Sequence, residues 1–242
     1  LSMDRRSIKI TPGRGLGNRL LSIAISQAIS DIDKINWVKT PECNVNFYDL
    51  FSYPKFSFLS DPSCYDTRQD LVKNNSIKDM MHQILLTSFH KKTKVKICTK
   101  FYETLRPSQT VSKQIKSIPD NTLGLHLRFT DHVQFMSEVD YEERVYSVIE
   151  KVKPDNIFIC SDTLYKKNYF IKALQDHNLI YYNLNLTDII KEFVYSPQRN
   201  SHDGMCSAVA EMFALSKCRW ILPNSISSFS MASFFMGQAK LL

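Results

Sequence analysis

The stretch "NIFICSDTLYKKNYFIKALQDHNLIYYNLNL", residues 156–186, is the part of the sequence that decides the fold class. It opens with an apolar run at 156–161, continues with a helical pattern at 164–177, and returns to a strand-like run at 179–186. Buried strands separated by one amphipathic helix are typical of a βαβ unit, whose strands lie parallel in one sheet. We therefore predict an α/β protein with a Rossmann-like layer.

The same alternation extends through the rest of the second half of the chain. Pro154 and Asp155 mark the joint between a helix and the strand that follows it. The further predicted elements are a strand at 122–129, a helix at 140–152, a helix at 204–218, a strand at 219–223, a short helix at 227–237 and a last strand from Ala239.

The first half begins in the same way and then becomes irregular. Its predicted elements are a strand at 7–12, a helix to about Ser30, an aperiodic connector or small subdomain at 40–75, a helix near 77–88, a strand near 93–99 and a helix near 107–117. We predict two halves, 1–118 and 119–242, which face each other across a cleft at the carboxyl ends of their strands.

Composition limits the classes of function. Of 242 residues, 43% are hydrophobic and 23% are charged, which is a globular balance, and the net charge of +7 favours an anionic partner. The densest basic cluster, 90–96, leads into a predicted strand, where lysines protect a solvated edge. Aromatic residues are not interleaved with arginine as a stacking platform for bases requires, so we expect no nucleic-acid partner.

The six cysteines show no C-x-x-C pair and no zinc-site spacing, so we expect no metal. We expect buried free thiols at 160, 206 and 218, whereas disulfides stay open for the cysteines at 43, 64 and 98. The apolar run at 220–239 is a poor membrane span, and no signal peptide is visible. We expect a soluble protein, with the cytoplasm favoured over a secretory lumen and the question of an upstream anchor left open.

A glycine-rich turn joins the first predicted strand to the first helix. Such a turn serves either as a tight corner or as a loop that lets a ligand approach the backbone. It fits neither the dinucleotide fingerprint nor a phosphate-binding Walker loop. Asn18 can cap the helix, while Arg14 and Arg19 suit an anion near the helix N-terminus. The glycines of the turn are Gly13, Gly15 and Gly17.

The segment "HLRFTDH", residues 126–132, ends the first strand of the second half. His126 and Arg128 share one face of this strand because side chains alternate with a period of two. Arginine at a strand end is suited to bidentate phosphate recognition. The structural alternative is an ion pair between Arg128 and Asp131.

Two further segments place polar side chains at strand ends. Ser225, Ser227, Ser228 and Ser230 crowd the junction between the strand at 219–223 and the next helix, where hydroxyls and amides bind phosphate or simply cap the helix. Asp162 follows the strand at 156–161, with helix capping as its structural alternative.

Together these motifs resemble the fucosyltransferase superfamily, which includes the α1,2-, α1,6- and protein O-fucosyltransferases. The similarity rests on G-x-G-L-G-N-x-L after the first strand, H-x-R-x-x-D at 126–131, Ser-Asp at 161–162 and the segment 203–230. It implies a GT-B-like fold, a GDP-sugar donor (GDP-fucose), inversion at the anomeric carbon and no required metal or other cofactor.

The resemblance also implies a role for individual residues. Arg128 would grip the donor diphosphate, and Glu211, where relatives have an aspartate, would read the guanine. The other substrate-binding positions that it implies, together with the Gly-rich loop around Arg14, Gly15 and Gly17, are Asn18, His126, Asp131, Ser227, Ser228 and Phe229, and the acid after the strand is Asp162.

The chain departs from these relatives at the acid–base position. The α1,6-type relatives continue after H-x-R-x-x-D with a lysine and a nearby glutamate, whereas this chain has His132 and Met136, with Glu138 two positions on. Either His132 is the base, with Asp162 as its rival and Glu138 a weaker one, or Arg128 and the serines carry the rate by stabilising the leaving diphosphate. We predict a fucosyltransferase acting on a glycan; the alternatives are transfer from another nucleotide sugar, such as a UDP-sugar, and a non-catalytic nucleotide- or glycan-binding module.

Overall fold

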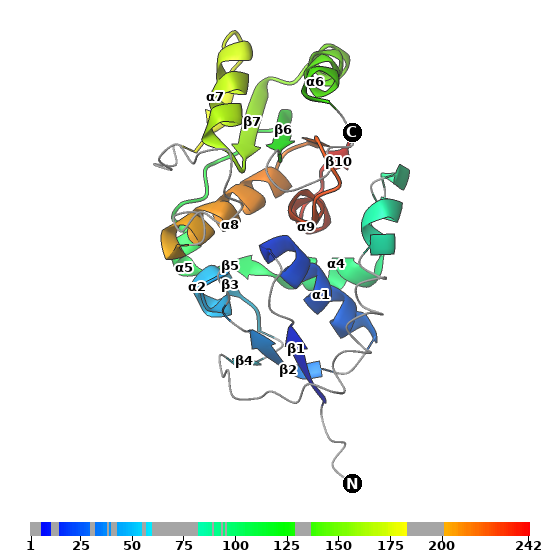
Figure 1. The fold of residues 1–242 in the computed structure, drawn as a ribbon, viewed down its shortest axis with the longest axis vertical. Helices are drawn as coiled ribbons and strands as arrows, with labels where there is room; N and C mark the ends of the chain where they lie inside the picture. The colour runs from blue at the N-terminus through cyan, green and yellow to red at the C-terminus, as the bar shows by residue number, and fades with distance from the viewer. Residues whose placement is uncertain are drawn as a thin grey trace.

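A computed structural model describes residues 6–10, 15–29, 32–37, 39, 43–54, 57–59, 82–88, 90–92, 94, 96–128, 137–182 and 201–242. Within these ranges the predicted α/β architecture is confirmed: two parallel sheets are separated by a layer of helices (Figure 1). No helix in the described ranges is long and apolar enough to cross a membrane.

The larger sheet contains the strands predicted for the second half of the chain. Its order is β10-β9-β6-β7-β8, and every neighbouring pair is parallel. All six residues of β6 are buried, as expected for the central strand of a sheet that is covered on both faces. The strands are β6 (Thr122–Leu127), β7 (Asn156–Ser161), β8 (Leu179–Tyr181), β9 (Trp220–Pro223) and β10 (Lys240–Leu241).

The helices of this half cover both faces of the sheet. One face carries α6 (Glu138–Val152) and α7 (Leu164–Ala173), and the other carries α8 (His202–Ser216) and α9 (Ser228–Met236) (Figure 1). The chain adds β7 and β8 on one side of β6 and then returns to add β9 and β10 on the other. The point where the order reverses, between β6 and β9, is where open α/β sheets bind their ligands.

The smaller sheet has the order β1-β2-β4, again parallel. Its first strand and the following helix match the prediction, whereas β2 lies in a segment for which we predicted no element. Polar and apolar residues alternate over 34–37 of β2, and the described apolar side chains, Ile35 and Trp37, are buried. These elements are β1 (Arg6–Ile10), α1 (Leu16–Ile29), β2 (Ile32–Trp37) and β4 (Ser57–Leu59).

Between the two sheets the prediction was only partly right. Residues 82–88 form the helix expected near 77–88, and the helix expected near 107–117 is the single turn α5 (Gln109–Ser112). The strand near 93–99 was wrong, because α4 (Lys96–Thr104) occupies this segment. Here the helical spacing of Phe101, Tyr102 and Leu105, all buried, outweighs the local β-branched residues. The connector contains α2 (Phe47–Leu50) and β3 (Phe51–Ser52), which pairs antiparallel with β5 (Arg106–Pro107).

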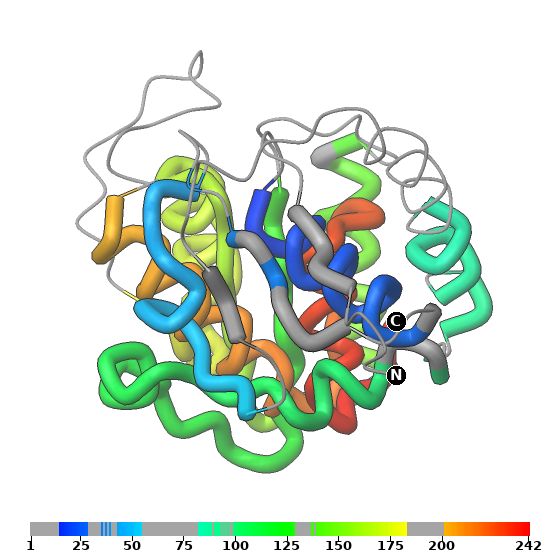
Figure 2. The backbone as a smooth tube through the Cα atoms, turned by 90° about the horizontal axis from the view of Figure 1, so that it is seen from below, coloured from blue at the N-terminus to red at the C-terminus, as the bar shows by residue number. Residues whose placement is uncertain are grey.

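Two hydrophobic clusters hold these layers together. The smaller cluster includes Leu125 of β6, Tyr141 of α6 and Phe170 of α7. The larger cluster joins the helices of both halves, for example by stacking of Tyr102 in α4 on Phe235 in α9, with ring centroids 5.5 Å apart. In both views α1 lies against α9 (Figures 1 and 2). This contact brings the first helix of the chain to the last.

Candidate functional site

The carboxyl ends of β6 and β9 are tied together by one buried side chain, Asn224. Its Oδ1 accepts from the backbone N–H of Arg128 at 2.8 Å, and its Nδ2 donates to the carbonyl of Arg128 at 2.9 Å. The backbone N–H of Asn224 also donates to the carbonyl of His126 at 3.2 Å. The amide thus continues the ladder beyond both strands and holds the backbone of Arg128, which is half-buried, at the switch point. Sequence reasoning missed Asn224, although a polar residue directly after a buried strand was a usable signal.

Asp162 lies beside the same strand end. Its backbone N–H donates to the carbonyl of Leu127 at 3.2 Å, so the first residue after β7 is held next to the end of β6. The alternative that Asp162 caps α7 was wrong: Thr163 is the cap, and its side chain accepts from the N–H of Lys166 at 3.3 Å. The Asp162 carboxylate is therefore not used in helix capping.

The serine-rich segment forms the N-terminus of α9. Ser227 caps the helix by accepting from the N–H of Phe229 at 3.2 Å, which confirms the capping interpretation for this serine. The Phe229 ring stacks on the His126 ring, with centroids 5.0 Å apart and planes 14° from parallel. Two motifs separated by about 100 positions in the sequence therefore lie in direct contact.

The N-terminus of α1 meets the N-terminus of α9. A Cβ atom added at Gly17 would lie 2.6 Å from the backbone nitrogen of Phe229 and 2.6 Å from the carbonyl carbon of Ser228, so only glycine permits this approach. At Gly15, by contrast, no atom would lie within 4 Å of an added Cβ. The first turn of a helix has backbone N–H groups without intrahelical partners and a partial positive charge, so the two helix starts together favour an anion at this edge of the sheet.

Other predicted residues of the glycine turn are placed differently. Asn18 was predicted as a possible cap of α1. The helix begins at Leu16, so Asn18 lies inside its first turn and is not the cap. Arg19 is fully buried, with its guanidinium 5.1 Å from the centroid of the Trp37 ring. The prediction of a ligand-facing arginine thus stays with Arg14, which, like Gly13, lies outside the described residues.

Residues 129–136 of the predicted acid–base segment also lie outside the described residues, whereas Glu138 begins α6. Asp131 and His132 belong to this segment, so neither the ion pair of Arg128 with Asp131 nor the base assignment of His132 is tested. The strand end that leads into the segment, at Arg128, belongs to the site described above.

Glu211 lies on α8 in a buried ion pair that sequence reasoning missed. Its Oε1 is 2.8 Å from Nζ of Lys167 on α7, and the two side chains are only 6% and 3% exposed. The helices cover opposite faces of the sheet, so the pair links them (Figure 1). Burial raises the pKa of the Glu211 carboxyl, and the charge of Lys167 opposes this shift. The signal was a lysine on the apolar face of a predicted helix, in line with Phe170.

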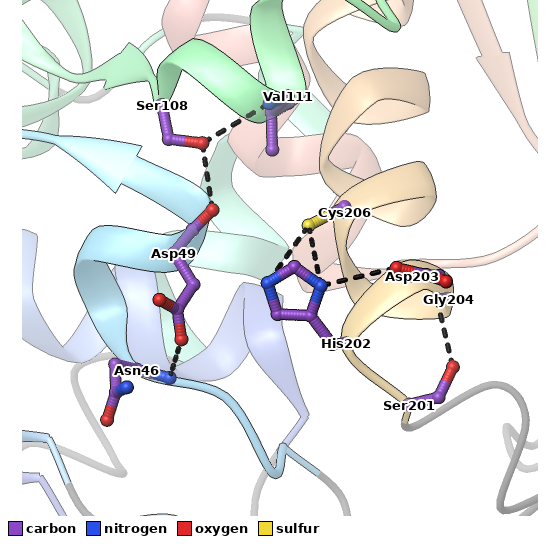
Figure 3. Close-up of polar contacts among 9 residues, drawn as sticks. All are labelled: Asn46, Asp49, Ser108, Val111, Ser201, His202, Asp203, Gly204 and Cys206. Carbon is purple, nitrogen blue, oxygen red and sulfur yellow. Dashed lines mark hydrogen bonds and ion pairs between the residues drawn. The ribbon is translucent and has the colours of Figure 1, made fainter.

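The start of α8 lies against α2 and carries a second group of polar side chains (Figure 3). Nδ1 of His202 lies 3.3 Å from Oδ1 of Asp203, and the two ring nitrogens lie 3.9 and 4.0 Å from Sγ of Cys206. Burial, followed by the charges of Asp203 and Asp49, raises the pKa of the Cys206 thiol. At neutral pH this cysteine is therefore a protonated thiol and a poor nucleophile.

The described cysteines are structural. Cys160, Cys206 and Cys218 are buried free thiols as predicted, and Cys43 is also buried and does not form the disulfide left open for it. Burial raises the pKa of Cys160 and Cys218 as well. The side chains of Cys64 and Cys98 lie outside the described residues. Within the described part of the chain, no group of three or more histidine, cysteine, aspartate or glutamate side chains could hold a metal ion.

These features define the class of protein: a double α/β fold in which polar residues and two helix N-termini gather at a topological switch point. No protein-family model and no curated protein matches the sequence.

Solved structures match along nearly the whole chain. The structure of the α1,6-fucosyltransferase NodZ soaked with GDP-fucose is 15% identical, with a TM-score of 0.61 and coverage of 97% of this chain and 93% of that one. The structure of NodZ from Bradyrhizobium is 14% identical, with a TM-score of 0.57 and coverage of 97% of this chain and 94% of that one. The apo form of POFUT1 is 10% identical, with a TM-score of 0.58 and coverage of 100% of this chain and 99% of that one. The protein therefore has the GT-B-like fold of these fucosyltransferases, which confirms the predicted fold class.

Proposed function

We propose that the protein is an inverting glycosyltransferase that moves fucose from GDP-fucose to a hydroxyl group of a glycan. The observation that carries this proposal is the convergence of the N-termini of α1 and α9 beside Arg128, at the switch point of the sheet. Support comes from the fold, since similar structures include NodZ soaked with GDP-fucose and POFUT1 in complex with GDP-fucose.

The reaction is a displacement at the anomeric carbon. The acceptor oxygen forms a bond to this carbon while the bond from the carbon to the β-phosphate oxygen breaks. GDP leaves with the electron pair, and the hydroxyl proton passes to a base. Charge accumulates on the leaving diphosphate, so donors and positive charge fixed at that position lower the barrier.

In this proposal Arg128 grips the diphosphate, and the N–H groups at the starts of α9 and α1 contact its oxygens. Ser227, Ser228 and Asn18 line the same position, while the stacked rings of His126 and Phe229 lie toward the nucleoside. Arg14 and Asp131 complete the donor site from the adjoining loops.

We assign donor binding to residues 119–242 and acceptor binding mainly to residues 1–118. The contact of Gly17 with the start of α9 supports a donor site that also uses the first helix of the acceptor half. No metal takes part in this proposal, because Arg128 and the helix N-termini supply the positive charge.

A donor with a different base is the second candidate, and Glu211 is the observation that favours it. One carboxylate oxygen of Glu211 already accepts a hydrogen bond from Lys167, so fewer of its lone pairs are left for a base. A guanine edge offers two adjacent donors and is bound best by both oxygens.

A nucleotide panel tests the class of protein and the donor together. Thermal unfolding is followed with GDP, UDP, ADP and their sugars, where a ligand at about 100 times its Kd adds about 2.7 kcal/mol. Preference for GDP supports the main proposal, and preference for UDP or ADP supports the second candidate. Binding without transfer to any glycan acceptor identifies a non-catalytic module, and the absence of any shift overturns both enzyme proposals.

Arg128→Ala tests the phosphate contact. We expect this variant to lose transfer activity and to bind GDP at least 30-fold more weakly, because loss of one partner of a buried charge pair costs about 2–5 kcal/mol. Its affinity for guanosine should change little. Arg128→Lys should recover little, since an ammonium group cannot replace the planar fork. Arg144→Ala, on α6, is the matched control. Unchanged GDP affinity in Arg128→Ala would show that the assigned role is wrong.

The base is identified by comparing His132→Ala with Asp162→Asn. A positioned base contributes about 10²–10⁴-fold to kcat. The variant that loses this factor while keeping its affinity for GDP identifies the base. If both variants keep the parent kcat, the reaction needs no protein base and is accelerated by stabilisation of the leaving group by Arg128.

A further inference from the structure

A second groove lies at the opposite edge of the large sheet from the proposed donor site. It encloses about 920 Å³. Asn121 and Arg219, which line it, directly precede β6 and β9, whereas the donor site follows the carboxyl ends of the same strands. The walls come from the end of α4, from β5, from the segment before β6 and from the C-terminal ends of α8 and α9. The groove therefore joins elements from both sides of residue 118.

The floor of the groove is apolar. Tyr102, Leu105 and Phe213 are buried side chains, and Ile115, Ile118 and Met236 are partly buried around them. A volume of this size is within the range of sites for small organic molecules, about 300–1,000 Å³. Such a floor accepts an apolar body of one or two rings.

The rim of the groove carries an excess of positive charge. Its charged residues are three exposed cations, Arg106, Lys217 and Arg219, and one carboxylate, Asp120. Among the residues that the structure describes, no carboxylate lies within ion-pair distance of any of the three cations. The rim therefore has a net positive charge, with none of its three cations in an ion pair with a described residue.

Neutral oxygens hold the two guanidinium groups in place. Nη1 of Arg106 donates to the carbonyls of Glu103 at 2.6 Å and of Leu105 at 2.9 Å. Nη1 of Arg219 donates to Oδ1 of Asn121 at 3.2 Å, and its guanidinium lies 4.7 Å from the centroid of the Trp220 ring. These contacts fix the side chains while leaving further N–H donors on each guanidinium.

The nearby helix ends do not cancel this preference for an anion. The C-terminus of a helix carries partial negative charge, and α8 and α9 both end at the groove. However, Lys217 directly follows α8, Arg219 comes two residues later, and Nζ of Lys94 donates to the carbonyl of Gly237 at the end of α9. Each helix end thus has its own cation.

From these observations we propose that the groove is a binding site for a small amphipathic anion: one carboxylate or sulfonate group held by Arg106 and Arg219, on an apolar body that packs against Phe213. The site is separate from the proposed donor site, and the proposal does not depend on the function proposed above.

The test uses a pair of fluorescent probes with the full chain. 8-Anilinonaphthalene-1-sulfonate carries a sulfonate on an apolar body, and N-phenyl-1-naphthylamine is the same body without the charge. We expect the sulfonate to bind at one site per chain, at least tenfold more tightly than the neutral probe. Arg106→Gln and Arg219→Gln should each lower the affinity for the sulfonate about tenfold and leave the affinity for the neutral probe unchanged. Lys151→Gln, on the outer helix α6, is the matched control and should have no effect.

GDP distinguishes this groove from the donor site. We expect saturating GDP to leave sulfonate binding unchanged. Displacement of the probe by GDP would overturn the proposal, because the probe would then occupy the donor site. Equal affinity for the two probes, or full affinity in both arginine variants, would overturn it as well.

Discussion

Gly17→Ser tests the contact that brings the first helix to the proposed donor site. The new Cβ would lie 2.6 Å from two backbone atoms at the start of α9 and 2.8 Å from the carbonyl oxygen of Ser228. Ordinary contacts begin near 3.4 Å. The starts of α1 and α9 must therefore separate by about 0.8 Å, since the opposing atoms belong to the backbone and cannot rotate away.

The cost follows from this overlap. Overpacking of a well-packed contact costs about 1–3 kcal/mol, and the higher helix propensity of serine returns about 0.5 kcal/mol. A net loss of about 1–2 kcal/mol lowers the Tm of a chain of this size by roughly 2–8 °C. Because Ser228 and Phe229 move with the helix start, GDP affinity should fall about tenfold as well.

Gly15→Ser is the matched control. It lies two positions earlier in the same turn, where no atom is within 4 Å of the new Cβ, and serine is a favoured residue before a helix. Its Tm should equal or exceed that of the parent. Denaturant unfolding and calorimetric titration with GDP measure both effects. Equal stability and equal GDP affinity of the two variants would show that the helix N-termini do not meet as described.

Three further predictions concern the groups that hold this arrangement. Asn224→Ala should cost about 2 kcal/mol in chemical unfolding, because two buried hydrogen bonds to Arg128 are lost, and Asn224→Asp, which keeps only the acceptor, should not restore GDP binding. Lys167→Met should lower the free energy of unfolding by about 3–5 kcal/mol, because it leaves a buried charge unpaired, and the double variant Lys167→Met/Glu211→Leu should lower it much less. Equal losses in the two variants would argue against a buried pair. Ellman's reagent at pH 8 should label at most two of the six cysteines before unfolding, since four are buried; rapid labelling of more than two would contradict this burial.

The regular part of the fold could be predicted from the sequence because each element there is long or strongly periodic. Every strand and helix predicted after residue 120 is found in the structure, although β8 ends at Tyr181 and is shorter than the predicted strand. The errors fall where the pattern is short. The strand at 32–37 was missed, and α4 was mistaken for a strand because its β-branched residues come before the apolar positions that pack on α1 and α9.

The sequence by itself determined which edge of the sheet carries the polar residues. A strand that ends in His-x-Arg, another that ends in Ser-Asp and a helix that begins with serines must all present these groups at the carboxyl edge of a parallel sheet, because the local period and the chain direction allow no other placement.

Only the tertiary structure decided which of these groups touch. The approach of Gly17 to the start of α9, the stacking of His126 on Phe229 and the pairing of Lys167 with Glu211 join positions 44 or more residues apart in the sequence. Such contacts depend on the strand order and on which face each helix covers. Both are set by the packing of the whole core, which no local pattern of residues contains.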